Sequence, residues 1–318
     1  MRDIFSEGLL YLDLLELYGS SYAVAELCGV AQSNVFRGAN ACSKLLNLGL
    51  RKDRAAGTYR IERNQDVQRD LRRLNQRLRA RENGQLRVLG TTGLLPSTLP
   101  LKQASLLREL PCQWSDPSLS LDYLEKGLID LVVLPAAAVR QRLPWPAQLR
   151  RPDLYVPVAP FVASAIAPWP RHFFTRLDHP LQQRPVAQWD HHFPLLCAET
   201  LPELPPLPAG LRLSSLSEEP GATAAPWHEC LQQQPDAVVC GAPQQILALA
   251  GADGQQTLQP LSSISPLMDP LLLVSLPHLV SEPLHKELSA LLRRCAHEQW
   301  QSSCHALGLQ SLLDLQSA

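Results

Sequence analysis

The sequence predicts an α/β protein with a largely helical beginning. None of the 28 prolines precedes Pro96, so the first 95 residues can form nearly uninterrupted helix. Beyond Pro96, proline separates short apolar runs that alternate with helical segments, which is typical of α/β domains. A chain of 318 residues is too long for one ordinary core. We therefore expect a helical N-terminal domain followed by a larger α/β region.

The composition is that of a globular protein, with 45% hydrophobic and 19% charged residues. The opening residues MRDIFSEGLL lack the basic and apolar regions of a secretory signal, and we find no run of 18 uncharged apolar residues. These features predict a cytoplasmic protein with no membrane partner.

Positive charge is concentrated early in the chain, although the formal net charge is only −1. Residues 1–90 contain 15 Lys or Arg and 10 Asp or Glu, and residues 51–81 alone contain 11 basic and 4 acidic side chains. A basic block in an otherwise acidic protein indicates a polyanionic partner for that block.

The first fifty residues predict a helix-turn-helix. A helical apolar period runs through residues 7–18, at Leu10, Leu14, Leu17 and Tyr18. A serine at position 20 or 21 can cap a second helix over 22–28, because its hydroxyl accepts a backbone N–H. Gly29 permits a tight turn before a third helix over 32–46. Two short helices, a glycine turn and a longer helix form this motif.

A small β-hairpin, or wing, is predicted over residues 50–61. Gly57 suits the tip, and Thr58, Tyr59 and Ile61 suit the returning strand. Arg54 and Arg60 would then be placed to meet phosphate groups.

A long helix is predicted next, over residues 65–82. Its apolar residues are spaced 4, 3 and 4 apart, as in a coiled-coil seam: Val67, Leu71, Leu74 and Leu78. The positions between them are mostly arginine. We interpret this segment as a dimerisation helix that pairs two reading heads; a helix packed only on its own domain is the alternative.

Residues 19–36 resemble the first signature of the LysR-type family of bacterial transcriptional regulators. The family pattern aligns without a gap and retains Gly19, Ser20, Ala25, Val30 and Gln32. Arg37 falls where the family often has a basic residue. Four positions depart from the pattern, namely Ala31, Ser33, Phe36 and Arg51, so the resemblance is to a divergent member with an atypical reading face.

Further segments resemble the family in the correct order, over essentially the whole chain: 85–92, 121–135, 179–190, 271–274 and 283–295. The resemblance implies a winged helix-turn-helix domain at 1–63, a linker (dimerisation) helix at 64–84 and an effector-binding regulatory domain at 85–318. That regulatory domain would consist of two α/β subdomains joined by a two-stranded hinge, like a periplasmic binding protein.

The resemblance also implies a function: a DNA-binding transcriptional regulator that acts on double-stranded DNA as a homodimer or homotetramer. The expected DNA contacts come from the second and third helices and the wing: Ser20, Tyr22, Gln32, Ser33, Asn34, Arg37, Arg54 and Arg60.

A small-molecule effector would bind in the cleft between the two subdomains. The matching positions are Thr91, Thr92, Ser115, Ala136, Ala163, Glu199, Thr200 and Gly241, of which the last four would line the far side. For Thr91 and Thr92, capping of the next helix is the alternative. Because few of these positions are basic and Trp114, Phe161 and Trp169 are near in sequence, we predict an uncharged or aromatic effector.

Two proline-flanked segments have less specific interpretations. Residues 169–178 are longer than the family's connection, and we interpret them as a lid or an interface insertion. Residues 201–210 read as a surface linker, with a partner-binding segment as the alternative.

The sequence offers no catalytic motif, so we expect no enzyme activity, no cofactor and no metal. The eight cysteines form no CxxC pair and read as small buried apolar residues, with redox sensing as the alternative. Peroxide sensing occurs in the family, but Cys197 falls within a strand and not in the loop that would carry the reactive residue. Two other functions stay open: a degenerate regulator that acts through a partner protein without an effector, and a solute-binding or enzymatic α/β protein.

Overall fold

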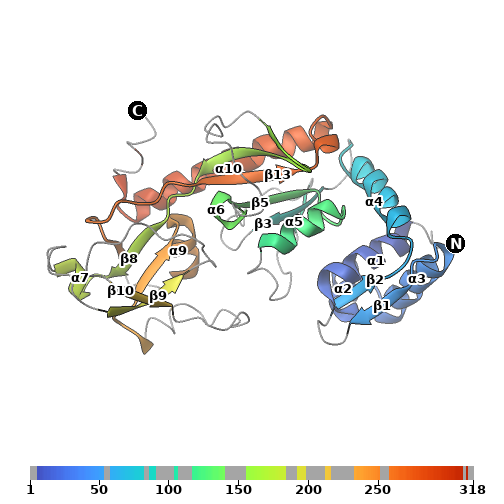
Figure 1. The fold of residues 1–318 in the computed structure, drawn as a ribbon, viewed down its shortest axis with the longest axis horizontal. Helices are drawn as coiled ribbons and strands as arrows, with labels where there is room; N and C mark the ends of the chain where they lie inside the picture. Colours follow the sequence, from blue (N-terminus) through green and yellow to red (C-terminus); the bar gives the residue numbers. More distant parts are fainter. Residues whose placement is uncertain are drawn as a thin grey trace.

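The computed structural model describes the folded elements of the chain and several of the segments between them. The described residues are 6–53, 58–81, 86–90, 104–106, 117–139, 155–183, 192–197, 212–215, 233–250, 258–310 and 313. Figure 1 shows an elongated molecule, with the N-terminal helices at one end, a sheet in the middle and a second sheet at the other end.

The N-terminal domain is a winged helix-turn-helix, as predicted. Its elements are α1 (Ser6–Tyr18), α2 (Ser21–Cys28), α3 (Gln32–Leu45), β1 (Leu50–Asp53) and β2 (Thr58–Ile61). The Ser20 hydroxyl caps α2 by accepting the Ala23 N–H at 3.4 Å. Gly29 ends α2 in the left-handed conformation, with φ 63°, which glycine adopts without strain.

The predicted apolar face of α1 is wrong at one position. Leu10 is exposed, whereas its neighbours Leu9, Tyr11, Leu12, Leu14 and Leu15 are buried. The helix is buried over most of its circumference, because it packs against α2, α3 and β2 and lies near the regulatory domain. A single apolar stripe therefore underestimates how much of α1 is covered.

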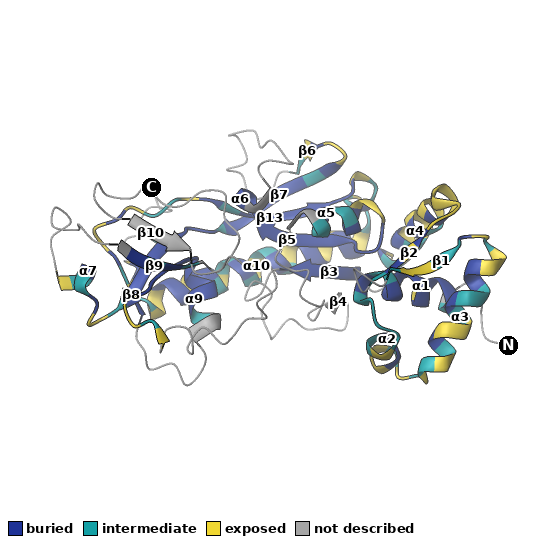
Figure 2. Cartoon of the chain, turned by 60° about the horizontal axis from the view of Figure 1, so that its bottom comes forward, coloured by how far each residue is buried: buried dark blue, intermediate teal, exposed yellow. Residues whose placement is uncertain are grey.

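Helix α4 (Gln65–Arg79) follows the wing and ends about three residues earlier than predicted. Its buried face is polar and consists of Gln68, Arg72 and Gln76. Its outer face carries exposed apolar residues, which Figure 2 shows as the exposed side of the helix. This inverts the usual amphipathic pattern, in which a helix buries its apolar side.

The first sheet of the regulatory domain has six strands in the order β4-β3-β5-β13-β7-β6. The strands are β3 (Leu86–Gly90), β4 (Ala104–Leu106), β5 (Leu131–Pro135), β6 (Val156–Val158), β7 (Phe161–Pro168) and β13 (Pro270–Ser275). Strand β3 is parallel to β4 and β5, but β13 runs antiparallel to both β5 and β7. The buried parallel strand expected at 131–134 is therefore parallel on one side only. Helices α5 (Pro117–Glu125) and α6 (Ala136–Val139) flank β5 along the chain.

The second sheet has five strands in the order β10-β9-β11-β8-β12. The strands are β8 (His172–Arg176), β9 (His192–Cys197), β10 (Arg212–Ser215), β11 (Val238–Gly241) and β12 (Leu258–Pro260). Helix α7 (Pro180–Gln183) follows β8 and helix α9 (Pro243–Ala250) follows β11. The two expected α/β subdomains are both present.

Two crossing segments join the sheets, which confirms the two-stranded hinge. The chain leaves the first sheet after β7 and returns to it at β13. The crossings pair with each other through an antiparallel bridge between Arg171 and Leu267, and the Trp169 N–H donates to the Asp269 carbonyl at 2.6 Å.

The interpretation of residues 169–178 as a lid or an interface insertion is wrong. The segment begins in the hinge and continues as β8, which lies between β11 and β12 in the second sheet. Phe173 and Phe174 point into its two opposite cores and are fully buried. The apparent insertion is therefore a core strand.

Helix α10 (Pro283–Ala306) runs across both subdomains and extends well beyond the predicted end at Cys295 (Figure 1). Its first half, from Leu284 to Ala296, packs in the core of the first sheet. Trp300 and Cys304 in its second half pack in the core of the second. Within the described ranges, neither α10 nor any other helix combines the length and apolarity that a bilayer crossing requires.

Candidate nucleic-acid interface and effector cleft

Helix α3 presents a partly polar face to solvent. Ser33, Phe36 and Arg37 are exposed, while Gln32 and Asn34 are half-buried. The Gln32 side-chain amide donates to the Ser21 hydroxyl at 2.8 Å, which fixes α3 against α2. Arg37 donates to the Asn34 side-chain oxygen, so the guanidinium is held along the helix surface. The sequence-predicted residues of α3 therefore lie at one surface.

Tyr22 and Phe36 add aromatic side chains to the exposed surface of this motif. Tyr22, in the first turn of α2, is 73% exposed, and Phe36 is 47% exposed. Ser20 has a different role, because its hydroxyl caps α2. An aromatic side chain on a reading helix can pack against a thymine methyl group.

The wing carries three exposed cations, Arg51, Lys52 and Arg60. Arg60 is exposed, and its guanidinium lies 3.7 Å from the Asp53 carboxylate. Arg51, on the neighbouring strand, pairs with Glu62 at 3.2 Å, and the Lys52 ammonium lies 5.4 Å from the centre of the Tyr59 ring. The predicted wing included Lys52, but the sequence analysis did not name it among the expected DNA contacts. Arg54 lies outside the described residues.

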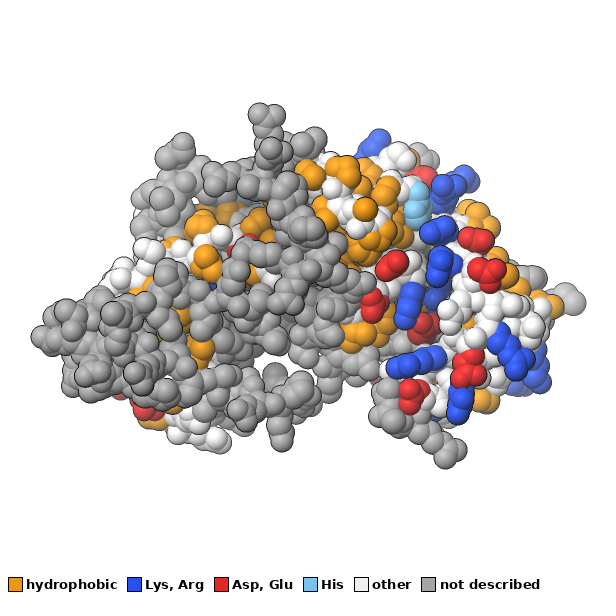
Figure 3. All heavy atoms as spheres, viewed as in Figure 1, with side chains coloured by type: hydrophobic (Ala, Val, Ile, Leu, Met, Phe, Trp, Pro, Cys, Tyr) orange, Lys and Arg blue, Asp and Glu red, His pale blue; other side chains and the backbone are white. Residues whose placement is uncertain are grey.

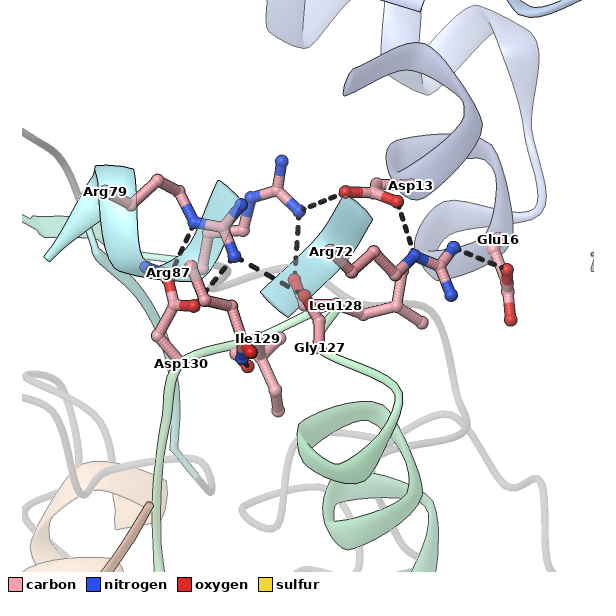
Figure 4. Close-up of polar contacts among 10 residues, drawn as sticks. Asp13, Glu16, Arg72, Arg79, Arg87, Gly127, Leu128, Ile129 and Asp130 are labelled. Carbon is pink, nitrogen blue, oxygen red and sulfur yellow. Dashed lines mark hydrogen bonds and ion pairs between the residues drawn. The ribbon is translucent and has the colours of Figure 1, made fainter. Parts of the chain in front are cut away.

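A buried ion-pair network joins the winged domain to helix α4 (Figure 4). Arg72 of α4 donates from Nε to Asp13 at 2.7 Å and from Nη2 to Glu16 at 2.9 Å; both acids are in α1. The other Asp13 oxygen accepts from Arg87 of β3 at 3.0 Å. Burial alone would raise the pKa of Asp13, but the guanidinium groups of Arg72 and Arg87 outweigh it and lower the pKa below its ordinary value. Asp13 is therefore an ionised carboxylate between two cations.

The same network continues into the regulatory domain. Arg79 of α4 makes a bidentate pair with Asp130, at 2.7 and 2.9 Å, and Asp130 also accepts the Arg87 backbone N–H at 2.8 Å. Arg87 donates to the Leu128 carbonyl and Gln76 to the Ile129 carbonyl, both at 3.0 Å. We call these side chains the junction network: Asp13, Glu16, Arg72, Gln76, Arg79, Arg87 and Asp130.

The junction network corrects the interpretation of the basic block. Arg72 and Arg79 belong to the 51–81 block that predicted a polyanionic partner, yet both are bonded to carboxylates inside the protein. The remaining block cations include Arg69, Arg73 and Arg77, which are exposed on α4. Figure 3 shows basic and acidic side chains intermixed over this end of the molecule. One sequence signal was available, because Asp13 interrupts an otherwise apolar stretch of α1.

Gly127 allows helix α4 to pack closely against the regulatory domain. This residue lies in the turn before β5 and has φ 74°. A Cβ atom there would lie 3.0 Å from the Arg72 Cβ and 3.2 Å from the Gln76 side-chain oxygen. Glycine thus provides both the backbone conformation and the space that α4 needs to approach the regulatory domain.

Three of the four seam residues of α4 are exposed. Val67, Leu74 and Leu78 are 40%, 55% and 52% exposed, while Leu71 is half-buried and packs against the core. Three of the four predicted positions thus form an apolar surface on the outside of the junction. The described part of the chain leaves these three side chains partly accessible.

The structure describes only part of the predicted effector cleft. Thr91, Thr92, Ser115, Glu199 and Thr200 lie outside the described residues. Ala136 begins α6 directly after β5, and Gly241 ends β11 in the second subdomain; both are buried. Ala163 lies within β7 of the first sheet, and not on the second subdomain as expected, because β7 precedes the hinge.

A buried charged pair lies near the hinge end of the cleft, where sequence reasoning expected a neutral lining. The Asp269 carboxylate accepts the Ala137 N–H at 2.7 Å, in the first turn after β5. The Arg171 guanidinium lies 3.7 Å from the same carboxylate, and both residues are buried. Their contact depends on the hinge fold, which brings positions 171 and 269 together, so spacing along the sequence gave no signal.

The described cysteines have the character of buried apolar residues. Cys42, Cys240 and Cys304 are buried, and Cys28 and Cys295 are half-buried. Burial raises the pKa of Cys42 and of Cys304 to about 11, so these thiols resist forming the reactive thiolate. Across the described segments, His, Cys, Asp and Glu side chains form no group of three that could hold a metal ion.

Comparison with known proteins gives matches in structure alone. No protein-family model matches the chain, and no curated protein matches its sequence. A full-length OxyR variant from Pseudomonas aeruginosa matches with a TM-score of 0.51 and 14% identity, covering 93% of this chain and 95% of that one. A probable transcriptional regulator from the same organism matches with a TM-score of 0.50 and 16% identity, covering 89% and 94%.

These matches extend over the winged domain, the linker and both regulatory subdomains together. The chain has the fold of a full-length LysR-type regulator. The LysR-type architecture accounts for the α/β fold class, with a winged helix-turn-helix, a linker helix and a two-subdomain regulatory domain.

Proposed function

We propose that the protein is a DNA-binding transcriptional regulator whose operator binding responds to a small effector in the regulatory domain. The observation that carries this proposal is the exposed surface of the helix-turn-helix, with Tyr22, Ser33, Phe36 and Arg37, on a LysR-type fold. Arg37 would contact a guanine edge or a phosphate, and Arg60 of the wing would contact the backbone.

Two copies would read two half-sites. The exposed seam of Val67, Leu74 and Leu78 supports pairing of the α4 helices, which places two copies of α3 at a fixed separation. Because the junction network ties each winged domain to its own α4, that separation would follow the geometry of the α4 pair. A homodimer, or a homotetramer built from it, is the proposed DNA-binding form.

The arrangement at the hinge supports an uncharged effector. The Ala137 N–H is a backbone donor that could bind a ligand carboxylate, but it already donates to the Asp269 carboxylate. The Arg171 guanidinium balances the Asp269 carboxylate, so this buried pair offers no net charge to a ligand ion. A neutral or aromatic ligand suits such a site, and cleft closure about the paired hinge would transmit its binding to the oligomer.

The test uses operator fragments recovered by a genome-wide pull-down of DNA bound to the full chain. Titration of one such fragment in a fluorescence anisotropy assay should give affinity that falls steeply with salt. Arg37→Ala should weaken binding by about tenfold, equivalent to the loss of one specific contact. Arg294→Ala, an exposed cation on α10, is the matched control and should leave the affinity unchanged.

Salt-independent or absent DNA binding would refute the proposal and favour a solute-binding protein. DNA binding that no ligand alters, across a thermal-shift screen of neutral, aromatic and dicarboxylate compounds, would favour the degenerate regulator that acts through a partner protein. Calorimetry that shows a preference for a small dicarboxylate would refute the neutral effector.

A further inference from the structure

Helix α3 turns one face to solvent, and Phe36 lies within that face. Ser33, Phe36, Arg37 and Lys44 share it by helical spacing, and all four are exposed. The opposite face is buried and packs against α1 and α2. Because Phe36 is 47% exposed, a large part of its surface is available to a molecule that lies along α3.

The charge of this face favours a polyanion. Arg37 and Lys44 are the only charged residues of α3, and neither forms an ion pair with a described residue. The Ser43 hydroxyl accepts the Leu50 N–H at 3.1 Å, so the wing, with its own exposed cations, begins against the end of α3. Double-stranded DNA complements this arrangement, because its major groove admits an α-helix while the phosphates on either side attract cations.

The amide side chains of α3 are partly committed inside the protein. The Gln32 amide nitrogen donates to the Ser21 hydroxyl at 2.8 Å, and the Asn34 amide oxygen accepts from Arg37. An amide reads adenine by using its nitrogen and its oxygen together. In both residues one of those two atoms already has a partner within the protein. A contact between Phe36 and a base competes with no internal hydrogen bond.

The chemistry of Phe36 selects one feature of the DNA bases. Most groups on the base edges in the major groove are hydrogen-bond donors or acceptors, which a hydrocarbon ring cannot pair. The C5-methyl group of thymine is the apolar exception. Contact with that methyl group removes apolar surface of both partners from water, which stabilises the complex. An exposed phenylalanine on this face therefore favours thymine over the other bases.

We propose that Phe36 is a specificity-determining residue and packs against the methyl group of a thymine in each half-site. This inference rests on the proposed function, because it requires α3 to lie in the major groove. Phe36 is one of the four positions at which the chain departs from the LysR-type pattern, so the family resemblance does not supply this contact. Lys44 and the wing cations would add affinity through phosphates without distinguishing bases.

The experiment compares DNA fragments that differ by single methyl groups. In one operator fragment recovered by the pull-down, each thymine of a half-site is replaced in turn by deoxyuridine, which keeps the base pair and removes only the C5-methyl group. Fluorescence anisotropy at fixed salt gives the Kd of the full chain for each fragment. Deoxyuridine at one or two positions should weaken wild-type binding by about fourfold, the loss expected for one buried methyl group.

Three variants test whether Phe36 makes this contact. Phe36→Ser should bind the thymine and deoxyuridine fragments with equal affinity, whereas Phe36→Leu, which keeps an apolar side chain, should still prefer thymine. Leu45→Ala is the matched control, because Leu45 is a 57% exposed apolar residue of α3 that lies off this face. It should keep the wild-type preference. All three side chains are exposed, so each variant should retain the wild-type circular dichroism spectrum.

The outcomes separate this inference from the function on which it rests. Salt-dependent binding that is equal for every thymine and deoxyuridine fragment would refute the role of Phe36 and leave the regulator intact. Methyl sensitivity that persists in Phe36→Ser would assign the contact to another residue. Loss of the preference in Leu45→Ala would show that it depends on the whole helix and not on Phe36. Absence of salt-dependent DNA binding would overturn both proposals.

Discussion

Removal of one carboxylate from the junction network should destabilise the protein strongly. Asp13 is fully buried and lies between Arg72 at 2.7 Å and Arg87 at 3.0 Å. In Asp13→Asn the side chain keeps its shape but loses its charge, and its new N–H₂ group faces one of the two guanidinium groups. Arg72 keeps Glu16 as a partner, whereas Arg87 loses its only described ion-pair partner.

The expected cost follows from this imbalance. Breaking a buried ion pair by removing one partner costs about 3–5 kcal/mol, because the other charge stays buried without compensation. Removing both members costs less than the sum of the single losses. The double variant Asp13→Asn/Arg87→Met should therefore lose about 0.5–3 kcal/mol less stability than the two single losses added together.

Urea unfolding followed by circular dichroism at neutral pH measures these values. Glu62→Gln is the matched control, because Glu62 pairs with Arg51 at the exposed wing and should cost less than about 1 kcal/mol. An Asp13→Asn loss no larger than that of the control would refute the buried network. Strictly additive losses in the double variant would show that Asp13 and Arg87 do not interact.

The remaining predictions concern pH, packing and assembly. Burial lowers the pKa of His285 to about 4; the nearby Asp130 opposes this shift and the Arg293 charge adds to it. Between pH 6.5 and 4, the unfolded chain therefore binds a proton at His285 that the folded chain does not. Stability should fall by about 3 kcal/mol as pH drops from 6.5 to 4, and His285→Gln should flatten that slope in urea titrations. Gly127→Ala should cost about 1–3 kcal/mol in the same assay, because it strains a left-handed residue against α4; an unchanged midpoint would contradict this packing. Leu74→Glu should dissociate the oligomer in sedimentation without lowering Tm of the isolated chain, and persistent oligomers would exclude the α4 seam.

Periodicity predicted the helical elements well, because each has a local cause. The Ser20 cap, the left-handed Gly29 and the 4-3-4 seam all act within a few residues, so α1 to α4 begin within about a residue of the predicted positions. Strand β8 was missed for the opposite reason. Its residues are sorted into two cores by strands β11 and β12, which come more than fifty residues later. Nothing local distinguishes such a strand from an inserted loop.

The residues of the candidate sites also fall into two groups, those that local sequence predicts and those that depend on distant partners. The exposed residues of α3 follow from the helix register, and the sequence predicts them. Arg72 and Arg79 read as surface cations, because helical spacing alone does not reveal which acids lie opposite them. Asp13 and Asp130 are more than fifty residues from their arginine partners along the chain. Partners at that separation emerge only when the domains are folded together.

The junction network has a consequence for the construction of chimeric regulators. Exchange of the winged domain at the boundary near residue 63 would separate Asp13 and Glu16 from Arg72 and Arg87. A donor domain without an acid opposite these arginines would leave two cations buried in the graft, and such a chimera should fail by unfolding, not by misreading its operator. Under the proposed function, operator specificity would be exchanged by substitutions on the α3 surface, where Ser33, Phe36 and Arg37 are exposed.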